Sequence, residues 1–290
     1  MRVGRPALSA GEAKARADAA AMEFVTTSER LSPLLSSGPH QSAIRPRALS
    51  ANDVRMGLMS GIAGYVDAAG FVTLVGLFPA HVTGELVGAA VAMSSGHLLK
   101  NPARLAIVPI FVLSVVVGAL ISRALRKRGQ SPLAALLGLM ALTLAFFSAS
   151  DLFLPALVDP SSGVTTVLRE GTAVAAMGFQ NVIMRRVLSA SCPTTVMTGN
   201  LTQFIIELVE LLLGRRGKHR DGQAMQAGSD LRLKLVGLAL SAFLLSAIVG
   251  GFLTTSYGTI SVALPTLVVA YLAYRESRHP SAASRTGTLF

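Results

Sequence analysis

The residues best suited to chemistry are polar side chains that recur in two related motifs inside apolar stretches. Asp67 ends the sequence Gly-Tyr-Val-Asp, and Asn181 ends the sequence Gly-Phe-Gln-Asn. Each is followed by an apolar-rich segment and then by Thr-Gly, with Glu85 after the first Thr-Gly and Asn200 after the second. A carboxylate at membrane depth is costly, so Asp67 is expected to have a partner, a bound cation or a proton.

The two Thr-Gly pairs are suited to the start of a helix inside a membrane. A threonine hydroxyl can cap a helix N-terminus, and glycine lets the backbone bend there. The exposed N–H groups and the helix dipole then favour an anion. The candidate substrate-binding residues are Thr83, Gly84, Glu85, Thr198, Gly199 and Asn200.

Asp67 has two open interpretations. In the first, Asp67 couples transport to a cation or proton, supported by Glu85. In the second, Asp67 hydrogen-bonds the break in the helix at Thr-Gly and holds it in place. Asn181 and Gln203 are placed in the same group of coupling or structural polar residues. The first copy of the motif carries both acids, so it is the better candidate for proton chemistry.

The doubled motif also indicates how the chain is organised. Both copies follow the pattern Gly-aromatic-x-Asp/Asn and then Thr-Gly-Glu/Asn-Leu, and the spacings from Asp67 to Thr83 and from Asn181 to Thr198 differ by one residue. Two linked motifs at nearly equal spacing indicate duplication. Repeat 1 is expected over about 54–150 and repeat 2 over about 170–275.

The composition predicts an all-α integral membrane protein. The 290 residues are 51% hydrophobic and 14% charged, whereas soluble domains carry about 25% charged residues. Long segments such as 107–121, 133–147 and 235–274 contain no charged residue, and about 20 apolar residues suffice to span a bilayer. The lipid bilayer is therefore an expected partner.

Eight apolar segments are expected, four in each half: 54–78, 83–99, 105–121, 133–147, 171–188, 195–213, 235–254 and 259–274. If all eight cross, the basic clusters at Arg123–Arg128 and Arg215–Arg220 fall on opposite sides. If the two Thr-Gly segments are short re-entrant or broken helices and six segments cross, the main basic clusters share one side, as the positive-inside rule requires. Three crossings per half make an inverted repeat. Eight crossings remain the alternative.

The domain boundaries follow from composition. Residues 1–50 are expected to be a disordered cytoplasmic extension, residues 51–280 a single transmembrane domain, and residues 281–290 a disordered tail. The charge pattern predicts that both termini lie in the cytoplasm.

Other functional classes find little support in the sequence. The net charge of +11 resides in short loops without interleaved aromatic residues, so nucleic acid is not an expected partner. The single cysteine, Cys192, and the isolated histidines His81 and His97 lack metal-ligand spacing. No nucleophile, base and acid occur together. We expect no metal, no cofactor and no enzyme activity; the sequence leaves the oligomeric state open.

The two motifs resemble those of the YoaK family of bacterial membrane proteins, also called the DUF1275 domain. The matching stretches are Gly64–Leu86 and Met177–Leu201, within a likeness that covers about 54–274. The Thr-Gly-Glu at Thr83 departs from the Thr-Gly-Asn of the family. The resemblance implies a bacterial multi-pass protein, expected in the inner membrane, and names no substrate or reaction.

The leading functional hypothesis is a secondary transporter or permease for a small, anionic solute. It depends on the doubled Thr-Gly motif with Asp67 and Glu85 at membrane depth. The alternative is a non-transporting membrane scaffold or sensor, in which small residues serve helix packing.

Overall fold

The computed structural model describes residues 50–74, 76–94, 103–157, 163–188, 197–213 and 222–280. Within these residues the chain forms eight α-helices and one short 3-10 helix, without strands, which confirms the all-α class. The elements are α2 (Ala51–Thr73), α3 (Val82–Ser94), α4 (Ala103–Lys127), α5 (Leu133–Leu157), α6 (Gly163–Arg186), α7 (Met197–Leu212), α8 (Gly222–Tyr257), η2 (Gly258–Val262) and α9 (Ala263–Arg278). Residues 1–49 of the predicted extension, the predicted tail 281–290, His97 and Cys192 lie outside the described residues.

The ends of α2 differ from the predicted range 54–78. The helix begins at Ala51 because Ser50 and Asp53 form a capping box: the Asp53 N–H donates to the Ser50 hydroxyl, and the Asp53 carboxylate accepts from the Ser50 N–H. It ends at Thr73, so Phe78 lies in the following connection. Apolar residues after Thr73 had suggested a longer helix, but they belong to a reversal of the chain.

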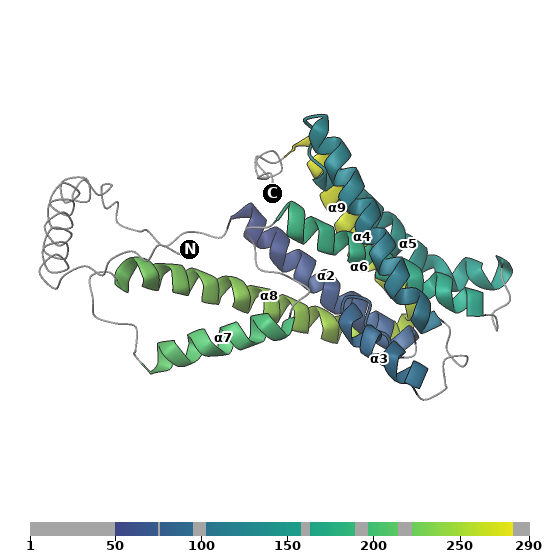
Figure 1. Ribbon diagram of the computed structural model, residues 1–290, viewed down its shortest axis with the longest axis horizontal. Coiled ribbons are helices and arrows are strands. Elements are labelled where there is room, and N and C mark those ends of the chain that lie inside the picture. Colours follow the sequence, from purple (N-terminus) through teal and green to yellow (C-terminus); the bar gives the residue numbers. More distant parts are fainter. Residues whose placement is uncertain are drawn as a thin grey trace, which may run out of the picture. The chain divides into compact units, whose positions relative to one another are not determined.

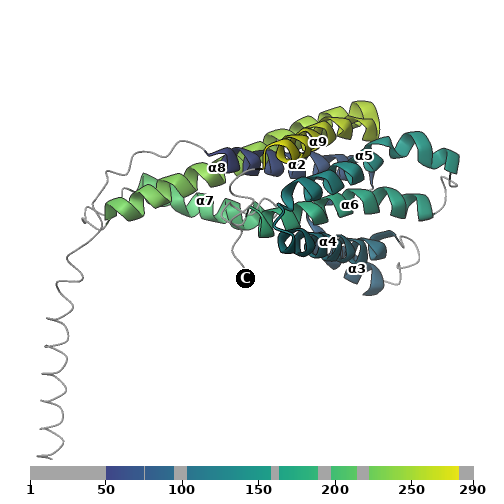
Figure 2. The same cartoon turned by 90° about the horizontal axis from the view of Figure 1, so that it is seen from above.

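Three pairs of helices form the main packing contacts. α2 packs along α8, and α6 packs against both α4 and α5. α5 also packs against α9, while α3 contacts α4 and α7 contacts α8. Figure 1 shows α2 beside α8 and the α4, α5 and α6 group, and Figure 2 shows the same elements from above.

Three segments are long and apolar enough to cross a membrane: Ala106–Lys127, Leu133–Pro155 and Leu231–Arg278. The last has 48 residues, and at 1.5 Å per residue a single helix of that length would reach about 70 Å, well beyond a bilayer core of about 30 Å. It is divided at η2, where Gly258 adopts a positive φ of 65°. α8 and α9 are the two resulting helices.

The apolar surface lies mainly on the helices that flank α2 and α6. α4 exposes Val112, Leu113 and Leu120, and α8 exposes Leu244 and Phe252, among other large apolar side chains. Such a surface suits lipid rather than water.

α2 and α6 are less apolar because they are packed inside the protein. Buried polar residues on these two helices include Ser60, Asp67, Glu170 and Gln180. Ser60 donates a hydrogen bond to the carbonyl of Ala239, and Gln180 donates to the carbonyl of Met59. Polar side chains on helices inside a membrane protein face protein partners in this way, which explains why hydropathy alone does not identify these two helices.

Candidate solute-binding site

The chain folds back on itself after α2. Gly70 permits the reversal: a Cβ there would lie 2.6 Å from the Cδ of Pro79 and 2.8 Å from the carbonyl oxygen of Leu77. Gly76 supplies a positive φ of 80°, which favours glycine. As a result the residues just before α3 lie beside Asp67, six residues before the end of α2.

Asp67 fixes the residues immediately before the first Thr-Gly pair. Its side chain is buried, its Oδ1 accepts from the N–H of Ala80 at 2.7 Å, and its Oδ2 lies 2.5 Å from Nδ1 of His81. Glu85, also buried, accepts from the N–H of Phe78 at 3.2 Å. Both acids of the first motif therefore hold the connection that delivers the chain to Thr83.

His81 lies in this connection, outside the three apolar spanning segments. Its hydrogen bond to Asp67 raises the pKa of the imidazole above its ordinary value of 6.5 and outweighs burial, which lowers the pKa. The ring is partly exposed and makes edge contacts with the rings of Phe78 and Phe243. His81 is thus a titratable group tied to a buried carboxylate.

A cavity of about 350 Å³ brings the two motifs together. Thr83 lines it from α3, and Thr198 lines it from α7. Asn181 and Arg185 reach it from α6, and His81 reaches it from the connection before α3. Val108 and Phe111 of α4 form part of its apolar wall. The two Thr-Gly starts therefore border one site, although they are far apart in the sequence.

The other predicted site residues do not line this cavity. Asp67 and Glu85 support the connection beside it. Gly84 has open space where a Cβ would be, and Gly199 is exposed. Asn200 is buried on α7, and Gln203 donates to the Glu207 carboxylate at 2.9 Å.

Glu207 is a buried acid on the helix that carries the second motif. Asn200, Gln203, Glu207 and Glu210 follow one another at spacings of three or four residues, so they share one face of α7. Glu207 is buried on this face, and α7 packs against α8. Burial of Glu207 with a hydrogen-bond partner agrees with the rule that buried polar groups are satisfied.

Sequence reasoning missed His81 and Arg185 as site residues. The sequence shows His81 as an isolated histidine without metal-ligand spacing, and Arg185 as one of two adjacent arginines. Arg185 follows Asn181 by one helical turn, so both lie on one face of α6. His81 directly precedes the Val-Thr-Gly sequence. These two sequence positions are the signals that could have identified Arg185 and His81 as site residues.

A second repeat, not recognised from the sequence, supports the helices that carry the motifs. Residues 111–118 of α4 read Phe-Val-Leu-Ser-Val-Val-Val-Gly, and residues 243–250 of α8 read Phe-Leu-Leu-Ser-Ala-Ile-Val-Gly. Gly178 of α6 packs on Ser114, and Gly64 of α2 packs on the carbonyl group of Phe243, so closely that a Cβ would overlap either partner. Each Gly-aromatic motif therefore packs on one copy of this second repeat.

A second cavity of about 380 Å³ lies among α2, α8 and α9 and is almost entirely apolar. Its lining includes Gly57, Tyr65, Leu238, Ala242 and Leu264, without a charged side chain. It is slightly larger, but it lacks the convergent polar groups typical of a solute site.

Within the described part of the chain, no three His, Cys, Asp or Glu residues are grouped as a metal site would need. A family model described as "Protein of unknown function (DUF1275)" matches residues 56–274. No curated protein and no solved structure matches the chain.

Proposed function

The chain belongs to the DUF1275 family, whose function is unknown, and from this premise we propose that it is a secondary transporter or permease for a small, anionic solute. The observation that carries the proposal is the shared cavity at Thr83 and Thr198. Solute sites at the interface of two repeats, formed by broken helices, are a recurring transporter architecture.

The proposed architecture is an inverted repeat with six crossing helices, in a bacterial inner membrane with cytoplasmic termini. The packing supports it: exchanging the two halves converts the α2–α8 contact into the α6–α4 contact, and the α3–α4 contact into the α7–α8 contact. The return of the chain to Asp67 just before α3 supports a re-entrant segment. The basic clusters then share one membrane side.

The test is solute binding followed by transport. Purified full-length protein is screened by thermal shift against a panel of inorganic and organic anions, with neutral solutes for comparison. Uptake of any stabilising solute is then measured in proteoliposomes. We expect Thr83→Val and Thr198→Val to reduce uptake at least about tenfold, because each removes a hydroxyl from the cavity. Thr255→Val is the matched control, since Thr255 is exposed on α8.

The proposal fails if no solute stabilises the protein or if both threonine variants transport normally. In that case the alternative, a non-transporting scaffold or sensor, gains support. The close helix contacts at Gly64 and Gly178 fit either function, because small residues allow helices to approach closely in membranes.

A further inference from the structure

The two ionisable side chains that line the cavity between the two motifs are both basic. His81 and Arg185 are the lining residues that can be cationic, and no Asp or Glu lines the cavity. None of the ion pairs formed among the described residues uses Arg185. The Asp67 carboxylate, outside the lining, offsets the charge of protonated His81, so Arg185 supplies the net positive charge that attracts an anion and repels a cation.

The opposite wall of the cavity is apolar. Leu86, Val108 and Phe111 contribute to it. The volume of about 350 Å³ lies within the range of sites for small organic molecules, roughly 300–1,000 Å³. An inorganic ion alone would leave most of this space and the apolar wall without contacts.

We infer that the ligand of this cavity is a small organic monocarboxylate, held by Arg185 and protonated His81, with its apolar part against Val108 and Phe111. A guanidinium group pairs with a carboxylate through two parallel hydrogen bonds. This inference rests on the proposed function and names its substrate class.

His81 links carboxylate binding to a proton. Its Nδ1 bonds to Asp67, so the other ring nitrogen, Nε2, is the one that can gain a proton and become a second cationic donor. The charged groups around it are Asp67 of α2, Glu85 of α3 and Arg185 of α6; α4 and α8 contribute the uncharged Phe111 and Phe243. By reciprocity, a bound anion favours the proton and the proton favours the anion.

The test uses three probes of matched size: butyrate, butyramide and butylammonium. Binding to the purified full-length protein is measured by calorimetry between pH 5 and 9. We expect butyrate alone to bind, with a Kd that rises about tenfold per pH unit above the pKa of His81 in the free protein and levels off at its higher pKa in the complex. Arg185→Gln should weaken butyrate binding at least about tenfold, whereas Arg186→Gln, at an exposed neighbour, should not. His81→Asn keeps a donor for Asp67 and should remove the pH dependence.

Equal binding of butyramide, no binding of butyrate, or butyrate binding that is unchanged in Arg185→Gln would overturn the inference. These outcomes are distinct from failure of the proposed function. An anion other than a carboxylate whose uptake requires Thr198 would leave the transporter proposal standing while excluding a carboxylate ligand.

A separate observation concerns two ion pairs that join the halves. Arg55 of α2 binds Glu276 of α9, with 2.6 Å between Nη2 and Oε2, and the Glu276 side chain is 1% exposed. Arg169 of α6 binds Asp151 of α5, with 2.7 Å between Nη2 and Oδ1. Arg55 precedes Gly64 by the same number of residues as Arg169 precedes Gly178. The two arginines are therefore equivalent positions of the repeat.

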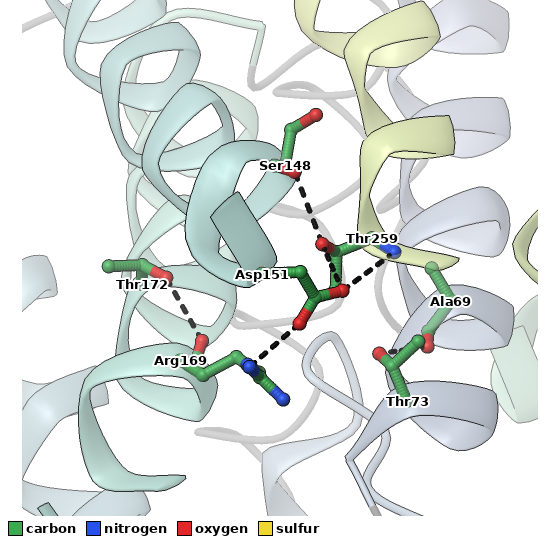
Figure 3. Close-up of polar contacts among 7 residues, drawn as sticks. All are labelled: Ala69, Thr73, Ser148, Asp151, Arg169, Thr172 and Thr259. Atoms are coloured by element: carbon green, nitrogen blue, oxygen red, sulfur yellow. Dashed lines mark hydrogen bonds and ion pairs between the residues drawn. The ribbon is translucent and has the colours of Figure 1, made fainter. Parts of the chain in front are cut away.

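The two pairs lie at opposite ends of α9. Glu276 is in the last turn of α9, and the Asp151 carboxylate accepts from the hydroxyl and N–H of Thr259, just before α9. Figure 3 shows Asp151 between Arg169 and Thr259. At 1.5 Å per residue, Thr259 and Glu276 are about 25 Å apart along the chain axis, close to the thickness of a bilayer core.

We propose that the two pairs are latches between the halves, one at each membrane face, and that transport requires them to open in turn. Each latch joins the first helix of one half to the last helix of the other. Removing one charge should favour opening at that face, because the partner charge left behind is better solvated when exposed.

The latches are tested with a cysteine reporter, Leu86→Cys, in a Cys192→Ser background. Leu86 lines the cavity and is exposed. The reporter cysteine is labelled with an impermeant maleimide in proteoliposomes of defined orientation. We expect Glu276→Gln to raise its labelling severalfold from one membrane face. Asp151→Asn should raise its labelling severalfold from the other face. Arg278→Gln, an exposed neighbour of Glu276, should change neither.

Two further measurements guard against misfolding. Combining Arg55→Glu with Glu276→Arg should restore the parental labelling pattern, and melting curves report whether each variant is folded. Labelling that rises from the same face in both single variants, or in neither, would overturn the latch proposal. Failure of the charge exchange to restore the pattern would overturn it as well.

Discussion

Gly178 on α6 packs directly on Ser114 of α4: a Cβ at position 178 would lie 2.9 Å from the Cβ of Ser114 and would overlap its hydroxyl. Gly178→Ala should therefore destabilise the protein by about 1–3 kcal/mol through overpacking. Thermal melting of purified protein measures this. Gly138→Ala on α5, where nothing lies within 4 Å of the added Cβ, should be neutral or slightly stabilising.

The contact between Gly178 and Ser114 also predicts a compensating substitution. Ser114→Gly removes the side chain that the methyl group added by Gly178→Ala would meet, so the double variant should melt at a higher temperature than Gly178→Ala alone. A double variant no better than the single one would show that the clash lies elsewhere.

Gly64→Ala should cost more than Gly178→Ala. Its added Cβ meets the backbone carbonyl group of Phe243, 2.9 Å from the carbonyl carbon, and a backbone cannot rotate aside as a serine side chain can. We expect more than about 3 kcal/mol, or a failure to accumulate, at the upper end of overpacking effects. Expression and melting of the two variants side by side settle the order; a milder effect at Gly64 would contradict it.

These glycines show how far the sequence predicts the fold. The Gly-aromatic motifs indicated a duplicated unit, but their packing partners could not be identified because Gly64 and Phe243 are far apart in the chain. The repeat of Phe-x-Leu-Ser in α4 and α8 was hidden inside uniformly apolar segments, where many similar residues mask a short pattern.

The candidate site was also predicted only in part from the sequence. Thr83, Thr198 and Asn181 were predicted and line one cavity. His81 was missed because its contact with Asp67 requires the chain reversal after Thr73, and the apolar residues there resemble a continued helix. Arg185 was missed because an arginine near a helix end is also what the positive-inside rule predicts for a loop.

Asp67→Ala tests the structural role of the buried carboxylate. The substitution leaves the N–H of Ala80 without its acceptor, and an unsatisfied buried donor costs about 1–3 kcal/mol. Asp67→Asn retains an acceptor for this N–H and should be milder in thermal melting. If Asp67→Asn keeps full stability but loses uptake of the identified solute, the carboxylate acts in coupling. Full stability with full uptake would confine it to structure.

The Asp67–His81 pair should make stability depend on pH. The folded protein raises the pKa of His81 above 6.5, so the folded state binds the proton more tightly than the unfolded state. The stabilisation is therefore complete below about pH 6.5, the unfolded pKa, and is lost as pH rises through the folded pKa. The difference in melting temperature between the parent and His81→Asn should shrink from pH 6 to pH 9. A difference that grows over this range would contradict the assignment.

The inverted repeat predicts that Arg126 and Arg216 lie on the same membrane side. The helices α5, α6 and α7 lie between these two positions. If α7 is re-entrant, two crossings separate the positions and they share a side, whereas with eight crossings three separate them and they lie on opposite sides. Arg126→Cys and Arg216→Cys, each in a Cys192→Ser background, are labelled with an impermeant maleimide in intact cells and in inverted vesicles. Both should react only in inverted vesicles, since basic loops face the cytoplasm. Labelling of one in cells and the other in vesicles would refute the inverted repeat. It would also contradict the assignment of the two ion pairs to opposite membrane faces.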